Sequence, residues 1–313
     1  MERVKFDLKL MDGEILKRQE DKLTFIPPFS YGKRSTYIDY QLVKGFGRDA
    51  LVPVIHYHIF SNYEDLVHGF STRLGGVSKQ HLASMNLSFS RGDEKEAVIL
   101  NHRRFAAAVG YDENSLVFSD QQHNTNIHIV KKEDKGKGFS RESDIENIDA
   151  LMTNEREIPL MTFYADCVPL FFYDPVNKAV ALAHSGWKGT VKKIGMKVIR
   201  AMGDAYGSNP KDIICAIGPS ICQECYEVDG DVIEKIRDAF DEASYDDLFY
   251  EKENGKYQLN LHQACKYTLL LAGVCEEHIA MPDLCTCCNG NALFSHRASK
   301  GMRGNLAAVI MLK

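Results

Sequence analysis

Residues 165–184 read ADCVPLFFYDPVNKAVALAH, two apolar runs that flank a short polar segment. Each run has the length of a β-strand and is rich in aromatic, aliphatic or small apolar residues. The four residues between them, from Asp174 to Asn177, are of the types that form turns. We therefore expect an antiparallel hairpin with a four-residue loop.

Pairing within this hairpin is expected to bring a cysteine close to a histidine. If Tyr173 pairs with Lys178, the same register makes Cys167 face His184. Opposed side chains on one face have Cβ atoms roughly 4.5–5.5 Å apart, which suits two ligands of one metal ion. A one-residue shift of the register places the two side chains on opposite faces. Pro169 lacks an amide donor and indicates an edge position or a bulge close to the pair.

The turn that follows His184 favours anion binding. Residues 185–190 read SGWKGT, with two glycines and the single tryptophan in front of a predicted helix. The first amide groups of a helix are free to donate to an anion, and Lys188 adds a positive charge. The hairpin thus predicts a candidate metal site beside a candidate anion site.

A cysteine sulfur together with imidazole nitrogen fits zinc, and fits copper less specifically. Three protein ligands and one open position are typical of catalytic zinc. Spacing does not identify the third ligand among eleven histidines, although polar loop residues around His123 make it attractive. Two other interpretations stay open. Cys167 and His184 are buried structural residues, or they are the nucleophile and base of a cysteine hydrolase.

The rest of the chain mixes strands and helices. Residues 1–50 hold short, charge-interrupted stretches such as Val4–Leu10, and we expect them to form an N-terminal β extension packed on a main domain of residues 51–313. Capping-box spacing over 93–96 predicts a helix that stops at Gly110. Other helices are expected from about 190 to 202, 232 to 240 and 260 to 273. Strands are expected over 66–72, 159–164, 168–173, 178–183, 213–217 and 306–312.

Composition excludes several classes of protein. A net charge of -5 over 313 residues leaves no broad basic surface for nucleic acid. No stretch approaches the roughly 18 apolar residues of a membrane span, and the first residues lack the apolar run of a signal peptide. We therefore expect a cytoplasmic protein without nucleic-acid or membrane partners. Its nine cysteines are then buried residues or metal ligands rather than disulfides.

Four of these cysteines form two Cys-x2-Cys pairs. Cys222 and Cys225 make one pair, and Cys285 and Cys288 make the other. Two such pairs can close a structural zinc site. The 59 residues between the pairs exceed the roughly 15–20 of a compact zinc ribbon, and Cys287 adds an alternative ligand. A second metal site is therefore a competing hypothesis.

Several short stretches, in chain order over roughly residues 55–312, together resemble a known family. They are Ser71–Ser78, Asn86–Ser88, Gln122–His123, Asp149–Leu151, Ala165–Pro169, His184–Thr190, Gly218–Ile221, Cys225–Val228 and Cys285–Thr286. The combination of DCVP and HSGW is specific. It resembles the family once named multicopper polyphenol oxidase, or laccase-domain proteins, whose members are described as purine nucleoside phosphorylases and in some cases as peptidoglycan editing factors.

The resemblance implies a zinc ion held by His123, Cys167 and His184. It also implies an α+β fold with mixed β-sheets sandwiched between helices. The implied activity is phosphorolysis of adenosine and inosine, with adenosine deamination and methylthioadenosine cleavage as related activities. We expect a purine nucleoside and phosphate as partners, and a monomer or homodimer. An editing protein for cell-wall precursors is an alternative. Copper can occupy such a site in vitro, but three ligands do not make the multinuclear centre of a phenol oxidase.

Cationic side chains are needed to bind phosphate, and Arg73, Lys188 and Arg297 are the predicted substrate-binding residues. Asp166 is expected to move a proton or to orient a ligand, and joins Cys167 and His184 as a predicted catalytic residue. Family members often have Ser-Tyr-Arg-Arg where this chain reads SHRA at 295–298, so one basic side chain is missing.

Overall fold

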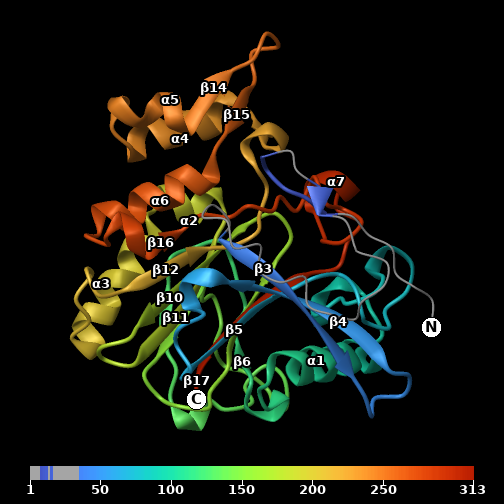
Figure 1. Cartoon of the computed structure of the whole chain (residues 1–313). Helices are drawn as coiled ribbons and strands as arrows, with labels where there is room; N and C mark the ends of the chain where they lie inside the picture. Colours follow the sequence, from blue (N-terminus) through green and yellow to red (C-terminus); the bar gives the residue numbers. More distant parts are fainter. Residues whose placement is uncertain (1–7, 13–14, 17–34) are drawn as a thin grey trace.

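The structure is a computed structural model that describes residues 8–12, 15–16 and 35–313. It has the predicted α+β fold. Two six-stranded mixed sheets lie face to face, and helices cover their outer faces (Figure 1). Helix α1 (Lys95–Val109) packs on one sheet, whereas α3 (Ile194–Tyr206) and α6 (Leu261–Leu271) pack on the other. The expected arrangement of sheets sandwiched between helices is confirmed.

The first sheet combines strands from residues 36–71 with the C-terminal strand. Its order is β3 (Thr36–Val43), β4 (Ala50–Tyr57), β5 (Leu66–Ser71), β17 (Leu306–Leu312), β9 (Leu160–Tyr164) and β6 (Val117–Phe118). Strand β17 shows how alternation builds two core layers. Leu306 and Ile310 face the second sheet, while Val309 and Met311 face α1. Successive side chains of a strand point to opposite faces, so one apolar strand serves both layers.

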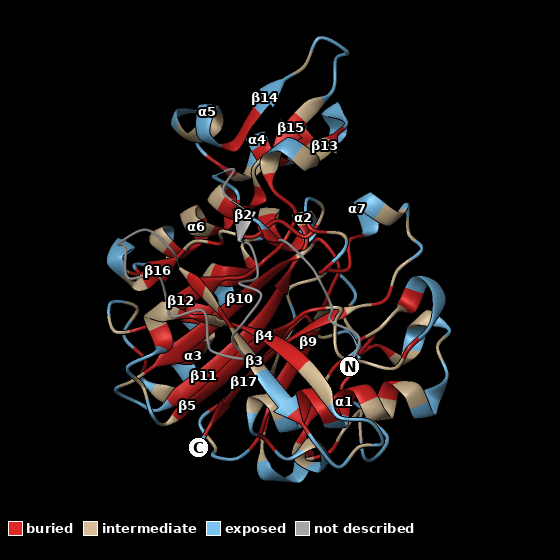
Figure 2. Ribbon diagram, turned by 45° about the vertical axis from the view of Figure 1, so that its right-hand side comes forward, coloured by how far each residue is buried: buried red, intermediate tan, exposed pale blue. Residues whose placement is uncertain are grey.

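The second sheet carries the predicted hairpin at its centre. Its order is β16 (Ile279–Ala280), β12 (Ile214–Ile217), β10 (Val168–Asp174), β11 (Ala179–Ser185), β8 (Ala150–Thr153) and β7 (Ile127–Ile129). Every residue of β10 and β11 is buried (Figure 2). A strand covered on both faces reads as a continuous apolar run, as residues 168–173 and 179–183 do.

The predicted register of the hairpin is wrong by two residues. Asp174 pairs with Ala179, and His184 pairs with Pro169 rather than with Cys167. The Asp174 carboxylate accepts hydrogen bonds from the amides of Val176 and Asn177 at 2.8 and 3.0 Å, so the strand continues through Asp174 before the loop begins. Because the shift is even, each side chain keeps its expected face.

The expected edge position of Pro169 is also wrong. Strand β10 lies between β11 and β12, in the interior of the sheet. Pairing with β12 begins only at Leu170, so the proline occupies the start of the strand, where its missing amide leaves no gap in that ladder. Its carbonyl oxygen still accepts from the amide of Gly218 at 2.8 Å.

The helices follow the sequence signals with two differences. Helix α1 ends at Gly110 with φ 93°, as predicted, but the expected capping box does not form. The Asp93 carboxylate instead accepts from Ser78 Oγ at 2.6 Å and Asn86 Nδ2 at 2.9 Å. The helix expected near residue 190 is split into α2 (Trp187–Val191) and α3, because Lys193 adopts a left-handed conformation with φ 57°.

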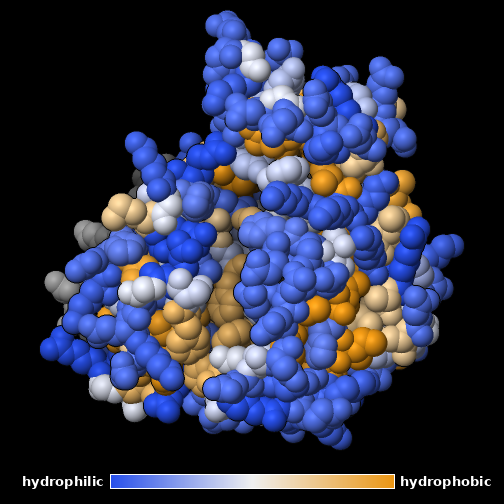
Figure 3. Space-filling model, turned by 180° about the vertical axis from the view of Figure 1, so that it is seen from behind, coloured by the Kyte–Doolittle hydropathy of each residue, from blue (hydrophilic) through white to orange (hydrophobic). Residues whose placement is uncertain are grey.

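A smaller unit projects from the main body (Figures 1 and 2). It contains a three-stranded sheet in the order β13 (Glu227–Val228), β15 (Tyr257–Leu259) and β14 (Phe249–Glu251), with helices α4 (Gly230–Ala239) and α5 (Tyr245–Leu248). The short helix α7 (His296–Ser299) precedes β17. Seen from behind, the molecular surface is mostly hydrophilic, with hydrophobic residues in and beside a central hollow (Figure 3).

The described N-terminal residues form strands, as expected. Strands β1 (Leu8–Lys9) and β2 (Ile15–Leu16) pair with each other, and β3 pairs with β4 over eight residues. Of the strand expected over Val4–Leu10, residues 4–7 lie outside the described residues. The division of the chain at residue 50 stays a prediction.

Within the described ranges, no helix has the length and apolarity to cross a membrane.

Candidate metal centre and adjoining cavities

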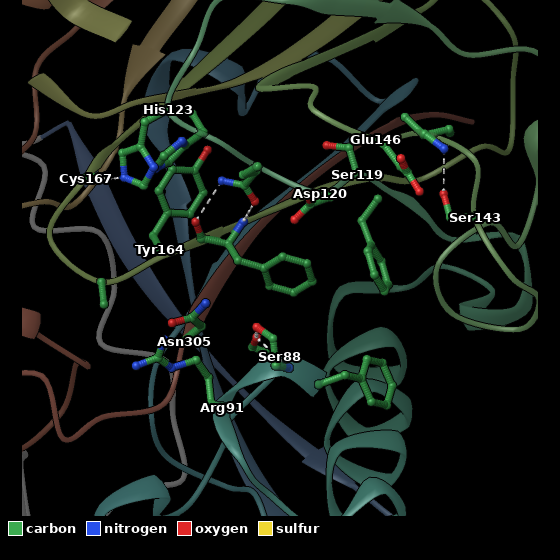
Figure 4. Close-up of a pocket in the computed structure, with 18 of the residues that line it drawn as sticks. Ser88, Arg91, Ser119, Asp120, His123, Ser143, Glu146, Tyr164, Cys167 and Asn305 are labelled. Atoms are coloured by element: carbon green, nitrogen blue, oxygen red, sulfur yellow. Dashed lines mark hydrogen bonds between the residues drawn. The ribbon is translucent and has the colours of Figure 1, made fainter. Parts of the chain in front are cut away.

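Three loop or strand ends bring His123, Cys167 and His184 together. His184 lies near the end of β11, Cys167 directly precedes β10, and His123 belongs to the loop between β6 and β7. Their ligand atoms all lie within 4.8 Å of one another. Cys167 Sγ and His123 Nε2 are 3.7 Å apart (Figure 4). The two-residue error in register does not separate the pair, since Cys167 sits diagonally beside His184 at the same end of the sheet.

Asp149, directly before β8, organises this group of residues. Its carboxylate accepts a hydrogen bond from His184 Nδ1 at 2.7 Å. It also accepts from the backbone amides of Gln122, His123 and Asn124 at 3.0, 3.0 and 2.9 Å. One fully buried carboxylate therefore fixes the His184 ring and the loop that carries His123. Binding of Nδ1 leaves His184 Nε2 free for a ligand.

The electrostatics favour an anionic sulfur. Burial alone raises the pKa of Cys167, but the charge of His184 and a hydrogen bond with His123 lower this pKa to about 6. Burial lowers the pKa of His184, but Cys167 and Asp149 together raise it to about 9. For Asp149, burial raises the pKa and is outweighed by the hydrogen bonds from His184 and the backbone amides, which lower it. The thiolate is the form of cysteine that binds metals.

The donor set fits one bound metal ion. Zinc–sulfur and zinc–nitrogen bonds of 2.3 and 2.0–2.1 Å at a tetrahedral angle place the two ligand atoms about 3.6 Å apart. The 3.7 Å between Cys167 Sγ and His123 Nε2 matches this separation. The residues that would hold the ion are His123, Cys167 and His184, which leaves one tetrahedral position open.

Gly186 permits the close approach of these ligands. A Cβ atom at this position would lie 2.9 Å from His123 Cδ2 and 3.1 Å from Cys167 Sγ. Two residues beside the site, His123 and Asp166, adopt left-handed backbone conformations with φ 58° and 89°. Such conformations are uncommon outside glycine, and they concentrate at functional sites.

The larger cavity beside the triad has a volume of about 530 Å³. Its walls combine aromatic, cationic, acidic and other polar side chains (Figure 4). They include Phe89, Phe118, Phe163 and Tyr164 together with Arg91, Arg303, Asp120, Glu146 and Asn305. Cys167, His123 and His184 close one end of the cavity. A volume of this size is typical of sites for small organic ligands.

Two arginines that line this cavity, Arg91 and Arg303, were not among the site residues predicted from the sequence. Nε of Arg91 and Nε of Arg303 are buried without a hydrogen-bond partner in the described part of the chain. Burial, and then the charge of Arg91, lower the pKa of Arg303 to about 10. Two guanidinium groups that line one cavity are of the type that binds anions through charge-assisted hydrogen bonds. No spacing rule marked them, because they lie 212 positions apart and meet only in the fold.

A smaller cavity of about 320 Å³ also borders His123 and Cys167. Trp187, Lys188 and Tyr226 line it, together with Gln122, Asp166, Gly186, Ile221 and Leu261. Lys188, one of the three cations expected at the substrate, has Nζ 5.7 Å from the centre of the Trp187 ring. Two of the three candidate metal ligands, His123 and Cys167, thus line both cavities.

The other predicted residues make defined contacts near the site. Arg73 Nε and Nη1 donate to the carbonyl oxygens of Ala83 and Gly290 at 2.8 and 2.7 Å, and Arg73 lines neither of these cavities. The Asp166 carboxylate accepts from Thr286 Oγ1 at 2.6 Å and from the amide of Arg297 at 2.7 Å.

Arg297 directs its guanidinium toward backbone oxygens. Its Nη1 and Nη2 donate to the carbonyls of Cys225 and Glu227 at 3.2 and 2.9 Å. Of the predicted residues, His123, Cys167, His184, Asp166 and Lys188 therefore surround the cavities, whereas Arg73 and Arg297 brace the adjoining loops.

The chain is similar to named proteins along most of its length. It is 37% identical over 254 residues to the purine nucleoside phosphorylase YlmD of Bacillus subtilis, covering 80% of this chain and 90% of that protein. It is 31% identical over 240 residues to adenosine deaminase RL5 from an unknown prokaryotic organism, covering 76% of this chain and 91% of that protein.

A solved structure has the same fold. The crystal structure of YlmD from Geobacillus stearothermophilus superposes with a TM-score of 0.78 at 33% sequence identity, covering 87% of this chain and 98% of that chain. The family described as multi-copper polyphenol oxidoreductase laccase matches residues 67–313. With the fold, the donor set and the similarity in agreement, this chain belongs to that laccase-like family.

Proposed function

We propose that the protein is a zinc-dependent purine nucleoside phosphorylase that converts adenosine or inosine and phosphate into the free base and ribose 1-phosphate. One observation carries the proposal. The Cys167, His123 and His184 donor set closes a cavity that also contains Arg91 and Arg303. The similarity to proteins named purine nucleoside phosphorylase supports the same substrate class.

The two substrates have distinct requirements, and the larger cavity meets both. Phosphate needs several charge-assisted hydrogen bonds, for which the guanidinium groups of Arg91 and Arg303 at the cavity wall are the candidate donors. The purine needs a flat apolar surface, which the rings of Phe118 and Phe163 offer. In the reaction a phosphate oxygen bonds to the ribose C1′ while the bond from C1′ to the purine nitrogen breaks. The electron pair of the broken bond passes to the purine, which takes up a proton.

The residues at the end of the cavity would hold and orient the metal. When bound, zinc supplies a Lewis acid that stabilises negative charge on an oxygen or nitrogen ligand. Asp149 holds the His184 ring in one orientation, and its carboxylate also anchors the His123 loop. Asp166 is tied to Thr286 and Arg297, so its proposed role is to position the loop before Cys167.

Adenosine deamination is the second candidate activity. Three protein donors leave one tetrahedral position for water, which is the arrangement of hydrolytic zinc sites. The similarity to adenosine deaminase RL5 supports this activity on the same class of substrate.

The proposal also includes a cytoplasmic location, because all nine cysteines, each within the described residues, are free thiols.

The decisive experiment measures metal content and products together. Purified protein incubated with inosine and phosphate should yield hypoxanthine and ribose 1-phosphate, and omission of phosphate should stop the reaction. Cys167→Ala should lose turnover and the metal ion bound by His123, Cys167 and His184, whereas Cys275→Ala, outside both candidate metal sites, should keep both. Full turnover by Cys167→Ala that has lost this metal ion would refute the metal-dependent mechanism.

The same pair of residues also fits a cysteine hydrolase, with Cys167 as nucleophile, His184 as base and Asp149 behind it. Two results separate this alternative. A hydrolase forms free ribose without consuming phosphate, and its nucleophile is alkylated at the same rate with or without zinc. A metal ligand is protected from alkylation by zinc.

A further inference from the structure

Four cysteines converge away from the candidate catalytic centre. Cys222 and Cys225 follow β12, while Cys285 and Cys288 belong to the loop after β16. Their sulfur atoms all lie within 4.8 Å of one another. Sγ of Cys288 is 3.5 Å from Sγ of Cys225 and 4.0 Å from Sγ of Cys222. The two Cys-x2-Cys pairs, 59 residues apart in sequence, form one cluster.

The sulfur separations match a single tetrahedral metal ion. Zinc–sulfur bonds of 2.3 Å at the tetrahedral angle place two thiolates about 3.8 Å apart. The measured 3.5 and 4.0 Å bracket this value. A disulfide requires about 2.0 Å, and the four thiols are free. An iron–sulfur cluster distributes its cysteines over several irons, which needs a wider set of sulfurs than this one.

Backbone amides already point at the cluster. The amides of Cys222 and Cys288 donate to Cys285 Sγ at 3.2 and 3.4 Å. Such bonds stabilise a thiolate, and they orient it as outer partners orient other metal ligands. Arg297 adds a positive charge nearby, since its Nη1 donates to the carbonyl oxygen of Cys225 at 3.2 Å. This charge offsets part of the net negative charge of a metal bound by four thiolates.

We propose that Cys222, Cys225, Cys285 and Cys288 form a second metal site, a closed structural zinc centre separate from the one at Cys167. Four protein sulfurs fill the tetrahedral coordination, so this ion has no position for substrate. Long sequence separation is no obstacle, because the residues between the pairs fold into the projecting unit of β13, β14, β15, α4 and α5, followed by α6 and β16. The metal ties the base of this unit to the main body.

The four-cysteine site would also fix the loop of residues 281–295, which contacts Asp166 beside the candidate metal centre at Cys167. Residues 281–295, all of them described, contain no helix and only isolated bridges, so side chains and caps must hold this loop. Within it, Thr286 donates to the Asp166 carboxylate, and its amide donates to the carbonyl of Ser220 at 3.0 Å. Asp166 in turn directly precedes Cys167. A metal at the four cysteines therefore positions Asp166 through Thr286.

Metal content of variants tests the proposal independently of activity. With zinc supplied, the wild-type protein should hold about two zinc ions per chain and Cys167→Ala about one, because the four-cysteine site stays intact. Adding Cys222→Ser and Cys288→Ser to Cys167→Ala should remove the remaining ion, whereas adding Cys275→Ser should not. A folded Cys167→Ala protein without bound zinc, or with iron in place of zinc, overturns the proposal.

Two measurements on Cys167→Ala avoid any variant that fails to fold. X-ray absorption at the zinc edge should show four sulfur neighbours at about 2.3 Å, and a mixed sulfur and nitrogen shell overturns the assignment. Removal of zinc by a chelator should speed hydrogen exchange at the amides of Thr286 and Cys288 by about tenfold or more. Exchange of α1 amides, far from the cluster, serves as the internal control, and equal rates at Thr286 with and without zinc contradict the structural role.

Discussion

The carboxylate of Asp149 lies 2.7 Å from Nδ1 of His184, and the same carboxylate accepts three backbone amides of the loop that presents His123. Two ligands from distant parts of the chain are thereby aligned by one buried group. The family stretch Asp149–Leu151 was part of the sequence resemblance, but no sequence signal assigned this role to Asp149. Its side chain would act on a bound metal ion only through the two histidine-bearing segments.

Asp149→Asn should weaken metal binding at the Cys167 site. The amide side chain carries no charge, and its nitrogen cannot accept the hydrogen bonds that the carboxylate accepts. Loss of such an outer partner typically reduces metal affinity by about 10–100-fold. Competition with a chromophoric chelator measures the affinity, and circular dichroism verifies the fold. Asp65→Asn, which changes an ion pair with Lys178 remote from the site, is the control. Unchanged affinity in folded Asp149→Asn contradicts this role.

Arg303→Ala and Arg91→Ala should each raise the KM for phosphate more than the KM for nucleoside. A charged hydrogen bond contributes about 1.5–3 kcal/mol, which corresponds to roughly a tenfold or larger change. Initial rates at varied phosphate with saturating inosine, and at varied inosine with saturating phosphate, give the two constants. Arg103→Ala removes an arginine of α1 that pairs with Glu113 outside the cavity, and it should leave both KM values unchanged. Equal effects of all three substitutions speak against a phosphate site at Arg91 and Arg303.

Gly186→Ala should displace the metal ligands while the protein stays folded. The added methyl group would lie 2.9 Å from His123 Cδ2 and 3.1 Å from Cys167 Sγ, so both side chains must move. We expect at least about a tenfold loss of metal affinity, comparable to the loss of an outer partner. Gly189→Ala is the matched control, since a Cβ there has its nearest contacts at 3.5 Å. Normal metal affinity in Gly186→Ala would show that the ligands are placed with more freedom than the structure indicates.

His102 should make the protein less stable in acid. Burial lowers the pKa of His102 to about 4, although its hydrogen bond to the Leu87 carbonyl raises this pKa slightly. The unfolded chain binds the proton below about pH 6.5 while the folded chain does not, so folding stability from this residue is present above pH 6.5 and is lost as the pH falls toward 4. Between pH 7 and pH 5 the expected loss is about 2 kcal/mol.

Urea unfolding at the two pH values measures this loss. His102→Gln removes the titrating group and should reduce the difference in unfolding free energy between pH 7 and pH 5. His81→Gln, at an exposed position, should not change that difference. An equal pH dependence in wild type and His102→Gln would mean that His102 is protonated in the folded protein.

Most of the local structure could be predicted from the sequence. The apolar runs of β10, β11 and β17, the stop of α1 at Gly110 and the Asn260 cap of α6 are signals between residues close in the chain. Local signals failed where a tertiary contact competed. Asp93 accepts from Ser78 and Asn86 instead of capping α1, and the side chain of Asp174 shifts the hairpin register by two residues.

Only the tertiary structure decided which distant residues share a site. Sequence spacing brought Cys167 and His184 to one end of a hairpin, because two paired strands fix the relative positions of their residues. It did not unite Arg91 with Arg303, and it left the joining of the two Cys-x2-Cys pairs as a competing hypothesis, because these groups meet through the packing of separate sheets and loops. Pairing within a hairpin follows from turn length, whereas contacts between layers depend on the whole core and leave no periodic trace in the chain.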